Sequence, residues 1–181
     1  MPLPLKQDYT INYIYSLPEG ERAELIDGQL YDMALPNTTH QKIVTRLSAV
    51  IDRHIQQKHG SCESFVAPFA VFLNSDGKNY VEPDISVICD KSKLDDQGCH
   101  GAPDWIIEVI SPSTEKIDYG VKLFKYRTAG IREYWIVNPF KRAVNVFDFE
   151  HNEQSKVYLF DDNIPSCIYP NLTVNIAALL A

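Results

Sequence analysis

Helical and strand patterns alternate along the first part of the chain. Residues 10–16 predict a short helix. Residues 23–31 predict a β-hairpin, because Asp27 and Gly28 suit the left-handed dihedral angles of a two-residue turn. A longer helix is expected over residues 37–58, where candidate N-caps are followed by an apolar stripe that is predicted to face the core. The stripe consists of Ile43, Val44, Leu47, Val50, Ile51 and Ile55.

Three apolar runs follow, at residues 64–73, 80–89 and 104–110. Each is short, bounded by turn or polar residues, and rich in β-branched or aromatic side chains, which is typical of strands. We expect the second and third runs to lie at the centre of a sheet. The segment between them, residues 90–103, contains two lysines and three aspartates and is expected to be a mobile loop.

A second long helix is predicted over residues 113–129. Ser113 or Thr114 would cap its start, and Gly130 would end it. Apolar residues recur on one side of this helix and predict its buried face. They are Ile117, Val121 and Phe124.

The rest of the chain is predicted to add three strands, at residues 133–138, 143–149 and 155–160. Helices and strands thus follow one another in an order that indicates a mixed α/β fold. Because the chain has 181 residues, no internal repeat and no linker-like stretch, residues 1–181 are expected to form a single domain.

The composition is that of an ordinary globular protein, with 45% hydrophobic and 23% charged residues. The chain has no basic start followed by an apolar run, and no apolar stretch reaches the roughly 18 residues that a membrane span needs. We therefore expect a soluble, cytoplasmic protein without membrane contact. The cysteines form no C-x-x-C pair, so we expect reduced thiols rather than a zinc site. They are Cys62, Cys89, Cys99 and Cys167.

The net charge is −7, from 24 acidic and 17 basic residues. This balance excludes a chain-wide basic surface of the kind that holds nucleic acid by counterion release. Positive charge is nevertheless concentrated in residues 111–145, which contain seven Lys or Arg residues against three Asp or Glu residues. Binding to a polyanion is therefore expected to be confined to this segment, and to be weak and salt-dependent without a divalent metal.

Two carboxylates interrupt runs that are otherwise typical of core strands. Asp84 follows Pro83 inside the second apolar run, and Glu108 lies in the third. A buried carboxylate must be paired or bind a cation, because an unpaired buried charge is costly. Two such residues on neighbouring strands form a natural oxygen site for Mg²⁺, and a metal-bound water could be a nucleophile.

The second long helix adds a charged flank. Lys122 and Lys125 lie four and seven residues after Asp118, so the three side chains share one side of the helix, beside its apolar face. This flank can lean over the two carboxylates, where a lysine could orient the attacking water or neutralise charge on a phosphate. The alternative is an ordinary surface ion pair between Asp118 and Lys122.

These residues together resemble a known family. The pattern comprises Pro83-Asp84, Glu108-Val109 24 positions later, Ser111-Pro112-Ser113-Thr114, Asp118, Lys122, Tyr126, Gly130 and Glu133-Tyr134-Trp135. It resembles the Uma-two family of restriction endonucleases, which belongs to the PD-(D/E)XK nuclease superfamily. The similarity extends from about residue 24 to residue 137. Tyr126 and Trp135 themselves are expected to be packing residues.

The resemblance implies a restriction-endonuclease-like core, with a central mixed β-sheet flanked by α-helices, and Mg²⁺-dependent hydrolysis of phosphodiester bonds in DNA. Mn²⁺ is expected to substitute for Mg²⁺. Asp84 and Glu108 match the metal-binding acids of the family motif, and Glu24 matches an upstream acid that approaches the metal in similar nucleases. His40 matches a position near the first long helix and is an accessory candidate. A homodimer is also implied, because many nucleases of this fold reach both DNA strands as dimers.

The match to the superfamily motif fails at one position. The motif places a lysine two residues after the second acid, but Ile110 stands there in this chain. The resemblance implies that in this family the role has moved to the helix, onto the position of Lys122, with Asp118 and Lys125 as accessory residues.

Several alternatives stay open at this point. The missing lysine favours a nuclease-like domain that has lost catalysis and binds DNA or a protein partner. A hydrolase of RNA or of a smaller phosphodiester would use the same residues. Glu24 could instead pair with Arg22, and His40 could be a capping or packing residue. The chain lacks a G-x-x-x-x-G-K-[ST] loop, so no nucleotide cofactor is expected, and it lacks G-x-S-x-G and H-E-x-x-H motifs.

Overall fold

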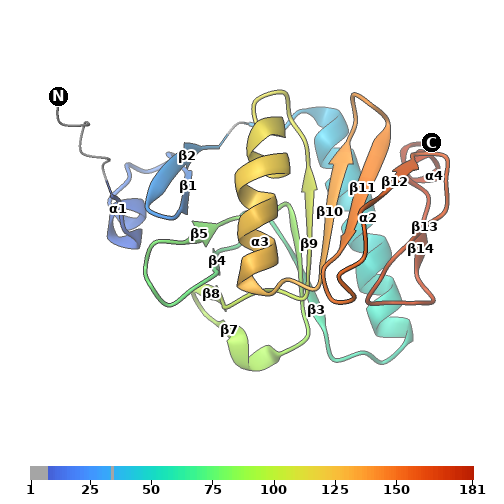
Figure 1. The fold of residues 1–181 in the computed structure, drawn as a ribbon, viewed down its shortest axis with the longest axis horizontal. Coiled ribbons are helices and arrows are strands. Elements are labelled where there is room, and N and C mark those ends of the chain that lie inside the picture. Colours follow the sequence, from blue (N-terminus) through green and yellow to red (C-terminus); the bar gives the residue numbers. More distant parts are fainter. Residues whose placement is uncertain (1–7, 34) are drawn as a thin grey trace.

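A six-stranded mixed sheet forms the centre of the molecule (Figure 1). The computed structural model describes residues 8–33 and 35–181, so the N-terminal residues examined for a secretory signal lie outside it. The strand order is β12-β11-β10-β9-β6-β3, and only β9 and β10 run parallel. The strands are β3 (Glu63–Val66), β6 (Ile85–Ile88), β9 (Trp105–Val109), β10 (Glu133–Asn138), β11 (Ala143–Asp148) and β12 (Lys156–Leu159). The predicted mixed α/β fold is confirmed.

A second six-stranded sheet has the order β2-β1-β5-β4-β8-β7. Its strands are β1 (Ala23–Ile26), β2 (Gln29–Asp32), β4 (Val71–Phe72), β5 (Tyr80–Val81), β7 (Leu94–Asp95) and β8 (Gly98–His100), and a separate pair is formed by β13 (Ile164–Pro165) and β14 (Thr173–Val174). The hairpin of β1 and β2 is confirmed, and its turn has positive φ angles of 49° at Asp27 and 73° at Gly28.

Helix α2 (Thr38–Gln57) covers one face of the central sheet, and α3 (Leu123–Ala129) covers the other (Figure 1). The side chain of Asn37 caps α2 by accepting a hydrogen bond from the backbone N–H of His40. The predicted apolar stripe of α2 packs against Trp105, Ile107 and Val109, so the alternate residues of β9 face α3. Glu108 is one of these alternate residues.

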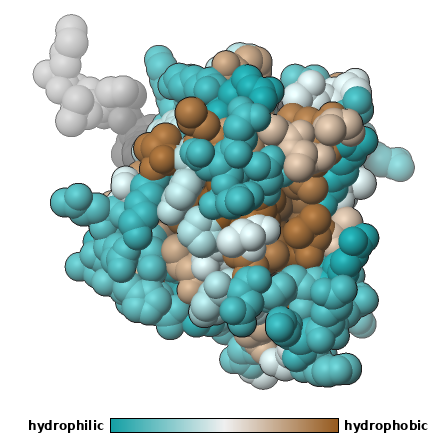
Figure 2. Space-filling view, turned by 90° about the vertical axis from the view of Figure 1, so that its right-hand side faces the viewer, coloured by the Kyte–Doolittle hydropathy of each residue, from teal (hydrophilic) through white to brown (hydrophobic). Residues whose placement is uncertain are grey.

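The short helices are α1 (Ile11–Tyr15), which confirms the prediction for residues 10–16, and α4 (Ile176–Leu180) near the C-terminus. Across the described part of the chain, no helix combines the length and the apolar character that a membrane crossing requires. The face formed by the C-terminal elements is hydrophilic around a hydrophobic patch (Figure 2). The edge strand β12 contributes exposed apolar side chains to the surface, at Val157 and Leu159.

The helix predicted over residues 113–129 contains a π-helical segment, η2 (Ile117–Lys122), before it continues as α3 and ends at Gly130. The predicted buried face is wrong, because Val121 and Phe124 are 38% and 69% exposed. A π-helix has i→i+5 hydrogen bonds, so its wider turn shifts the side chains away from the positions that α-helical spacing assigns. The side chains that are buried instead are Asp118, Lys122, Lys125 and Tyr126.

Two predicted strands are each divided between the two sheets. The run 64–73 forms β3 and β4, and the run 80–89 forms β5 and β6. Both divisions contain a proline, Pro68 and Pro83, and proline cannot donate a hydrogen bond to a neighbouring strand. The second division places Asp84 where the chain passes from one sheet to the other.

The prediction of a mobile loop over residues 90–103 is wrong. This segment contains a 3-10 helix (Lys91–Lys93), capped by the side chain of Asp90, and the hairpin of β7 and β8. β8 also pairs in parallel with β4, which attaches the segment to the second sheet. At Gly98 an added Cβ would collide with the carbonyl oxygen of Ala70, so this pairing depends on glycine.

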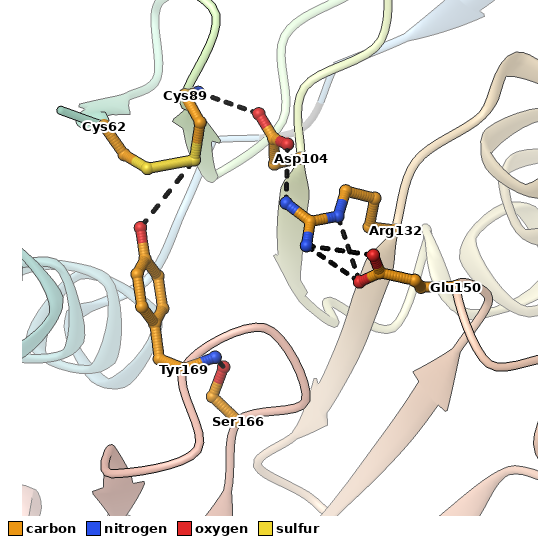
Figure 3. Close-up of a disulfide and its surroundings, with 7 residues drawn as sticks. All are labelled: Cys62, Cys89, Asp104, Arg132, Glu150, Ser166 and Tyr169. Atoms are coloured by element: carbon orange, nitrogen blue, oxygen red, sulfur yellow. Dashed lines mark hydrogen bonds and ion pairs between the residues drawn. A yellow bond between two sulfur atoms is a disulfide. The ribbon is translucent and has the colours of Figure 1, made fainter. Parts of the chain in front are cut away.

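Cys62 and Cys89 form a disulfide between β3 and β6 (Figure 3), so the expectation of reduced thiols is wrong for this pair. The register of the two strands pairs Glu63 with Ile88 and therefore sets the two cysteines opposite each other. The backbone N–H of Cys89 also donates to Asp104 at 2.7 Å. The remaining cysteines, Cys99 and Cys167, are free.

Removing the disulfide is expected to lower the free energy of unfolding by about 2–4 kcal/mol, because the bond restricts the unfolded chain across a sequence separation of 27 residues. Urea denaturation of the double variant Cys62→Ser/Cys89→Ser without reductant measures this loss, with Cys167→Ser as the control for removal of a free thiol. Equal midpoints for the oxidised and the dithiothreitol-reduced wild-type protein would contradict the expectation.

Candidate active site

A cavity of about 190 Å³ lies where the two sheets meet. The π-helical segment η2 lines one side of it. Its lining includes six of the seven predicted site residues, which are Glu24, His40, Asp84, Glu108, Asp118 and Lys122. These residues come from β1, α2, the start of β6, β9 and η2. Lys125 does not line the cavity and pairs instead with Asp27 in the hairpin turn.

Asp84 lies at the division between the sheets, directly before β6. Its Oδ2 accepts a hydrogen bond from the backbone N–H of Val109 at 2.8 Å, which fixes the carboxylate beside the end of β9. Nε2 of His40 lies 3.1 Å from the same oxygen. The predicted adjacency of Asp84 and Glu108 is confirmed, because β6 and β9 are hydrogen-bonded neighbours and the backbone N–H of Asp84 points to Oε2 of Glu108 at 3.4 Å.

Glu108 projects from β9 toward the helix. Its Oε1 accepts hydrogen bonds from Nζ of Lys122 and from the hydroxyl of Tyr126, both at 2.8 Å. Burial is the main reason that the pKa of Glu108 is raised to about 8. The charge of Lys122 lowers this pKa, and the nearby carboxylates, above all Asp118 and Asp84, raise it. The carboxyl groups of Glu24, Asp84, Glu108 and Asp118 thus share one cavity with the single ammonium of Lys122.

Lys122 belongs to the π-helical segment η2, and its ammonium lies among three carboxylates. Its Nζ is 2.7 Å from Oε2 of Glu24, 2.8 Å from Oε1 of Glu108 and 3.7 Å from Oδ1 of Asp118. Burial lowers the pKa of Lys122, but the charges of these three carboxylates raise it well above its ordinary value. The ammonium therefore stays protonated, although its side chain is only 6% exposed.

Glu24 is held in place by two hydrogen bonds from different elements. Lys122 contacts both of its oxygens, and the backbone N–H of Glu82 donates to Oε1 at 3.0 Å. The alternative that Glu24 pairs with Arg22 is wrong, because Arg22 pairs with Glu82. Glu24 therefore joins β1 of the second sheet to the cluster on the first.

His40 lies in the first turn of α2, where its backbone is capped and its side chain reaches Asp84. Its Nδ1 is buried and has no hydrogen-bond partner among the described residues. The imidazole thus orients one oxygen of Asp84 through Nε2.

The expectation that Tyr126 is only a packing residue is incomplete. The side chain is fully buried, as predicted, but its hydroxyl donates to Glu108. The spacing of four residues from Lys122 places both side chains on the same flank, which is the signal that could have identified it.

The basic residues of 111–145 are mostly engaged in contacts within the protein. Lys122 and Lys125 are buried in ion pairs, and other members are bound to polar or acidic partners: Arg127 to Asn152, Arg132 to Asp104 and Glu150, Lys141 to Glu115, and Arg142 to Asp161. Most of the positive charge is thus neutralised within the protein, and the cavity itself is acidic.

The described residues contain no ready-made metal centre of three or more His, Cys, Asp or Glu side chains. The ammonium of Lys122 separates Glu24 from Glu108. The donor set nevertheless fits a hard divalent cation, since several carboxylates surround one cavity and Oδ1 of Asp118 is buried without a hydrogen-bond partner among the described residues. A cation that binds Asp84 and Glu108 would neutralise the excess charge that Lys122 leaves.

Comparisons with known proteins show the family and the fold of the chain. The sequence model of the Uma2 family, described as "Putative restriction endonuclease", matches residues 8–177. The chain is 30% identical over 130 residues to the uncharacterized protein slr1290 of Synechocystis sp. (71% of this chain, 67% of the relative). It is 27% identical over 123 residues to the uncharacterized protein sll1609 of the same organism (66% and 68%).

A crystal structure from Anabaena variabilis, described as a "putative nuclease belonging to DUF820", has a similar fold. The TM-score is 0.76 at 21% sequence identity, and the match covers 94% of this chain and 96% of that one. The arrangement of the central sheet and its flanking helices is thus found in a solved structure as well.

Proposed function

The chain belongs to the Uma2 family of restriction-endonuclease-like proteins, and from this we propose that it is a Mg²⁺-dependent endonuclease that hydrolyses phosphodiester bonds in DNA. One observation carries the proposal. The lysine that the superfamily motif places two residues after Glu108 is absent, but Nζ of Lys122 lies 2.8 Å from Oε1 of Glu108. This contact supports Lys122 as the replacement for the absent lysine, beside Asp84 and Glu108.

We propose that Asp84 and Glu108, assisted by Glu24, hold the metal, and that Mn²⁺ can replace Mg²⁺. A bound divalent ion would lower the pKa of a water molecule and neutralise charge on the scissile phosphate. The protein's own residues prepare the ligands. The backbone N–H of Val109 and the imidazole of His40 fix Asp84, and the Tyr126 hydroxyl fixes Glu108.

Lys122 has a separate role in this proposal. The neighbouring carboxylates raise the pKa of its ammonium, which is buried next to these acids, where electrostatic interactions are stronger than in water. It stabilises the negative charge that develops on the phosphate as water attacks in line. Asp118 keeps the ammonium within the cluster rather than acting on the substrate.

The acidic cavity affects how DNA binds. Because the basic residues of 111–145 are mostly paired, we expect weak, salt-dependent DNA binding without a divalent cation. A bound metal would relieve the repulsion between the carboxylates and the phosphate. A homodimer stays a prediction.

A substrate panel tests the proposed activity. The purified protein is incubated with Mg²⁺ and, separately, with EDTA, on duplex DNA, single-stranded DNA, RNA and a small phosphodiester. We expect cleavage of DNA that requires Mg²⁺. Cleavage of RNA or the small diester alone would reassign the substrate, and DNA binding without any cleavage would favour an inactive, nuclease-like binding domain.

A further inference from the structure

The ammonium of Lys122 lies inside a cage of three carboxylates from three separate elements. Glu24 comes from β1, Glu108 from β9 and Asp118 from η2. The three carboxylates lie 2.7, 2.8 and 3.7 Å from Nζ, and each of these side chains is at most 7% exposed. The cage is therefore shielded from bulk water and contains only one positive charge.

Asp118 is the carboxylate of the cage that Lys122 does not hydrogen-bond. Its side chain is 3% exposed, and Oδ1, the oxygen nearest Nζ, has no hydrogen-bond partner among the described residues. A separation of 3.7 Å is too long for a hydrogen bond, so Lys122 provides charge but no direct bond there. An unpaired buried carboxylate oxygen that lines a cavity indicates that a cation can be bound at this point.

The two oxygens of Glu108 face different partners. Oε1 accepts from Lys122 inside the cage, whereas Oε2 lies on the side of Asp84, whose backbone N–H approaches it at 3.4 Å. Asp84 has no contact with Lys122, and its Oδ2 is bound by Val109 and His40 instead. Glu108 thus separates two neighbouring positions where positive charge is needed.

We propose that the cage of Glu24, Glu108 and Asp118 is a second cation site, which the ammonium of Lys122 fills in place of a metal ion. This inference rests on the proposed function, in which the first position, at Asp84 and Glu108, takes the divalent metal. Carboxylate oxygens are the ligands that Mg²⁺ and Mn²⁺ prefer. A two-metal hydrolase uses two such ions to hold the attacking and leaving oxygens. In this chain a tethered ammonium takes the place of one of them.

The proposal predicts that removing the lysine side chain creates a metal site. Mn²⁺ binding to the full chain is measured by calorimetry and by the loss of the free Mn²⁺ signal in electron paramagnetic resonance. We expect about one bound Mn²⁺ in the wild type and about two in Lys122→Ala, because the vacated cage then contains three uncompensated carboxylates. The double variant Lys122→Ala/Asp118→Asn is expected to return to about one.

The matched control is Lys125→Ala, which removes another buried lysine of the same helix whose partner, Asp27, lies outside the cavity. It should still bind one Mn²⁺. One Mn²⁺ in folded Lys122→Ala, as in the wild type, would overturn the inference. No Mn²⁺ in the wild type and one in Lys122→Ala would support the cage and contradict the metal site of the proposed function instead.

A second variant keeps the test decisive if Lys122→Ala does not fold. Asp118→Asn alone retains the lysine in the cage, so it should still bind one Mn²⁺, with an affinity within about tenfold of the wild type. A decrease of more than about tenfold, the size expected for loss of a metal contact, would place Asp118 at the first metal position and overturn the inference.

Discussion

Asp84→Asn and Glu108→Gln are each expected to lower the rate of Mg²⁺-dependent DNA cleavage by about 10³-fold or more, which corresponds to at least about 4 kcal/mol of transition-state stabilisation. Both substitutions preserve the size of the side chain and remove its charge. The carbonyl oxygen of Gln at position 108 can still accept the hydrogen bonds of Lys122 and Tyr126. The loss should therefore come from metal binding rather than from misfolding.

Initial rates of plasmid nicking measure this effect, and circular dichroism verifies the fold. Asp32→Asn is the control, because Asp32 is an exposed carboxylate at the rim of the same cavity and is not a proposed ligand. Its rate should stay within about threefold of the wild type. Full activity of Asp84→Asn or Glu108→Gln would contradict the assignment of both acids.

Lys122→Met is expected to lower the turnover rate about 10²–10³-fold, the usual cost of removing one group that stabilises transition-state charge. Methionine has a similar length but no charge, so the effect should fall on turnover more than on the apparent affinity for DNA. The variant should also unfold more easily, because Glu24 and Glu108 lose their buried partner, and such a loss costs about 3–5 kcal/mol.

Lys125→Met is the matched control for this experiment. Lys125 lies three residues further along the same helix, but it pairs with Asp27 and does not line the cavity. We expect single-turnover rates close to those of the wild type. If Lys122→Met, measured below its melting temperature, cleaves as fast as Lys125→Met, Lys122 is not the replacement for the lysine missing at position 110.

The sequence was sufficient to predict that Asp84 and Glu108 would be adjacent. Both lie in short apolar runs, and strands formed by such runs tend to be neighbours, as β6 and β9 are.

The same argument could not identify which buried acid belongs to a site. Glu133 is also a buried carboxylate on a central strand, but it accepts hydrogen bonds from four donors and needs no cation. Its donors come from Trp135 and from residues 166–168, and only the folded chain brings the latter to it.

The side of the helix that faces the core could not be predicted correctly. The interpretation of residues 113–129 assumed α-helical spacing and assigned the buried face to apolar residues. The π-helical turn at Ile117–Lys122 changes that spacing, and the charged flank is buried while Phe124 is exposed. The prediction that Asp118 and Lys122 lean over the carboxylates is nevertheless confirmed. The rule that apolar residues at α-helical spacing form the buried face thus fails in this segment. It fails where charged residues of the candidate site are buried instead.

The disulfide could not be predicted from the sequence for a different reason. Cys62 and Cys89 lie 27 residues apart and form no recognisable motif. Only the register of β3 and β6 sets them opposite each other, and register is determined by the whole sheet rather than by local sequence.

We propose above all that this chain cleaves DNA with a divalent metal bound at Asp84 and Glu108 beside Lys122. Titration of Mg²⁺ into the metal-free wild-type protein with supercoiled plasmid tests it most directly. We predict no nicking without metal, nicking that rises and saturates as Mg²⁺ is added, and arrest on addition of EDTA. A folded protein that leaves the plasmid intact at every Mg²⁺ and Mn²⁺ concentration, or that nicks it equally well in EDTA, would contradict the claim.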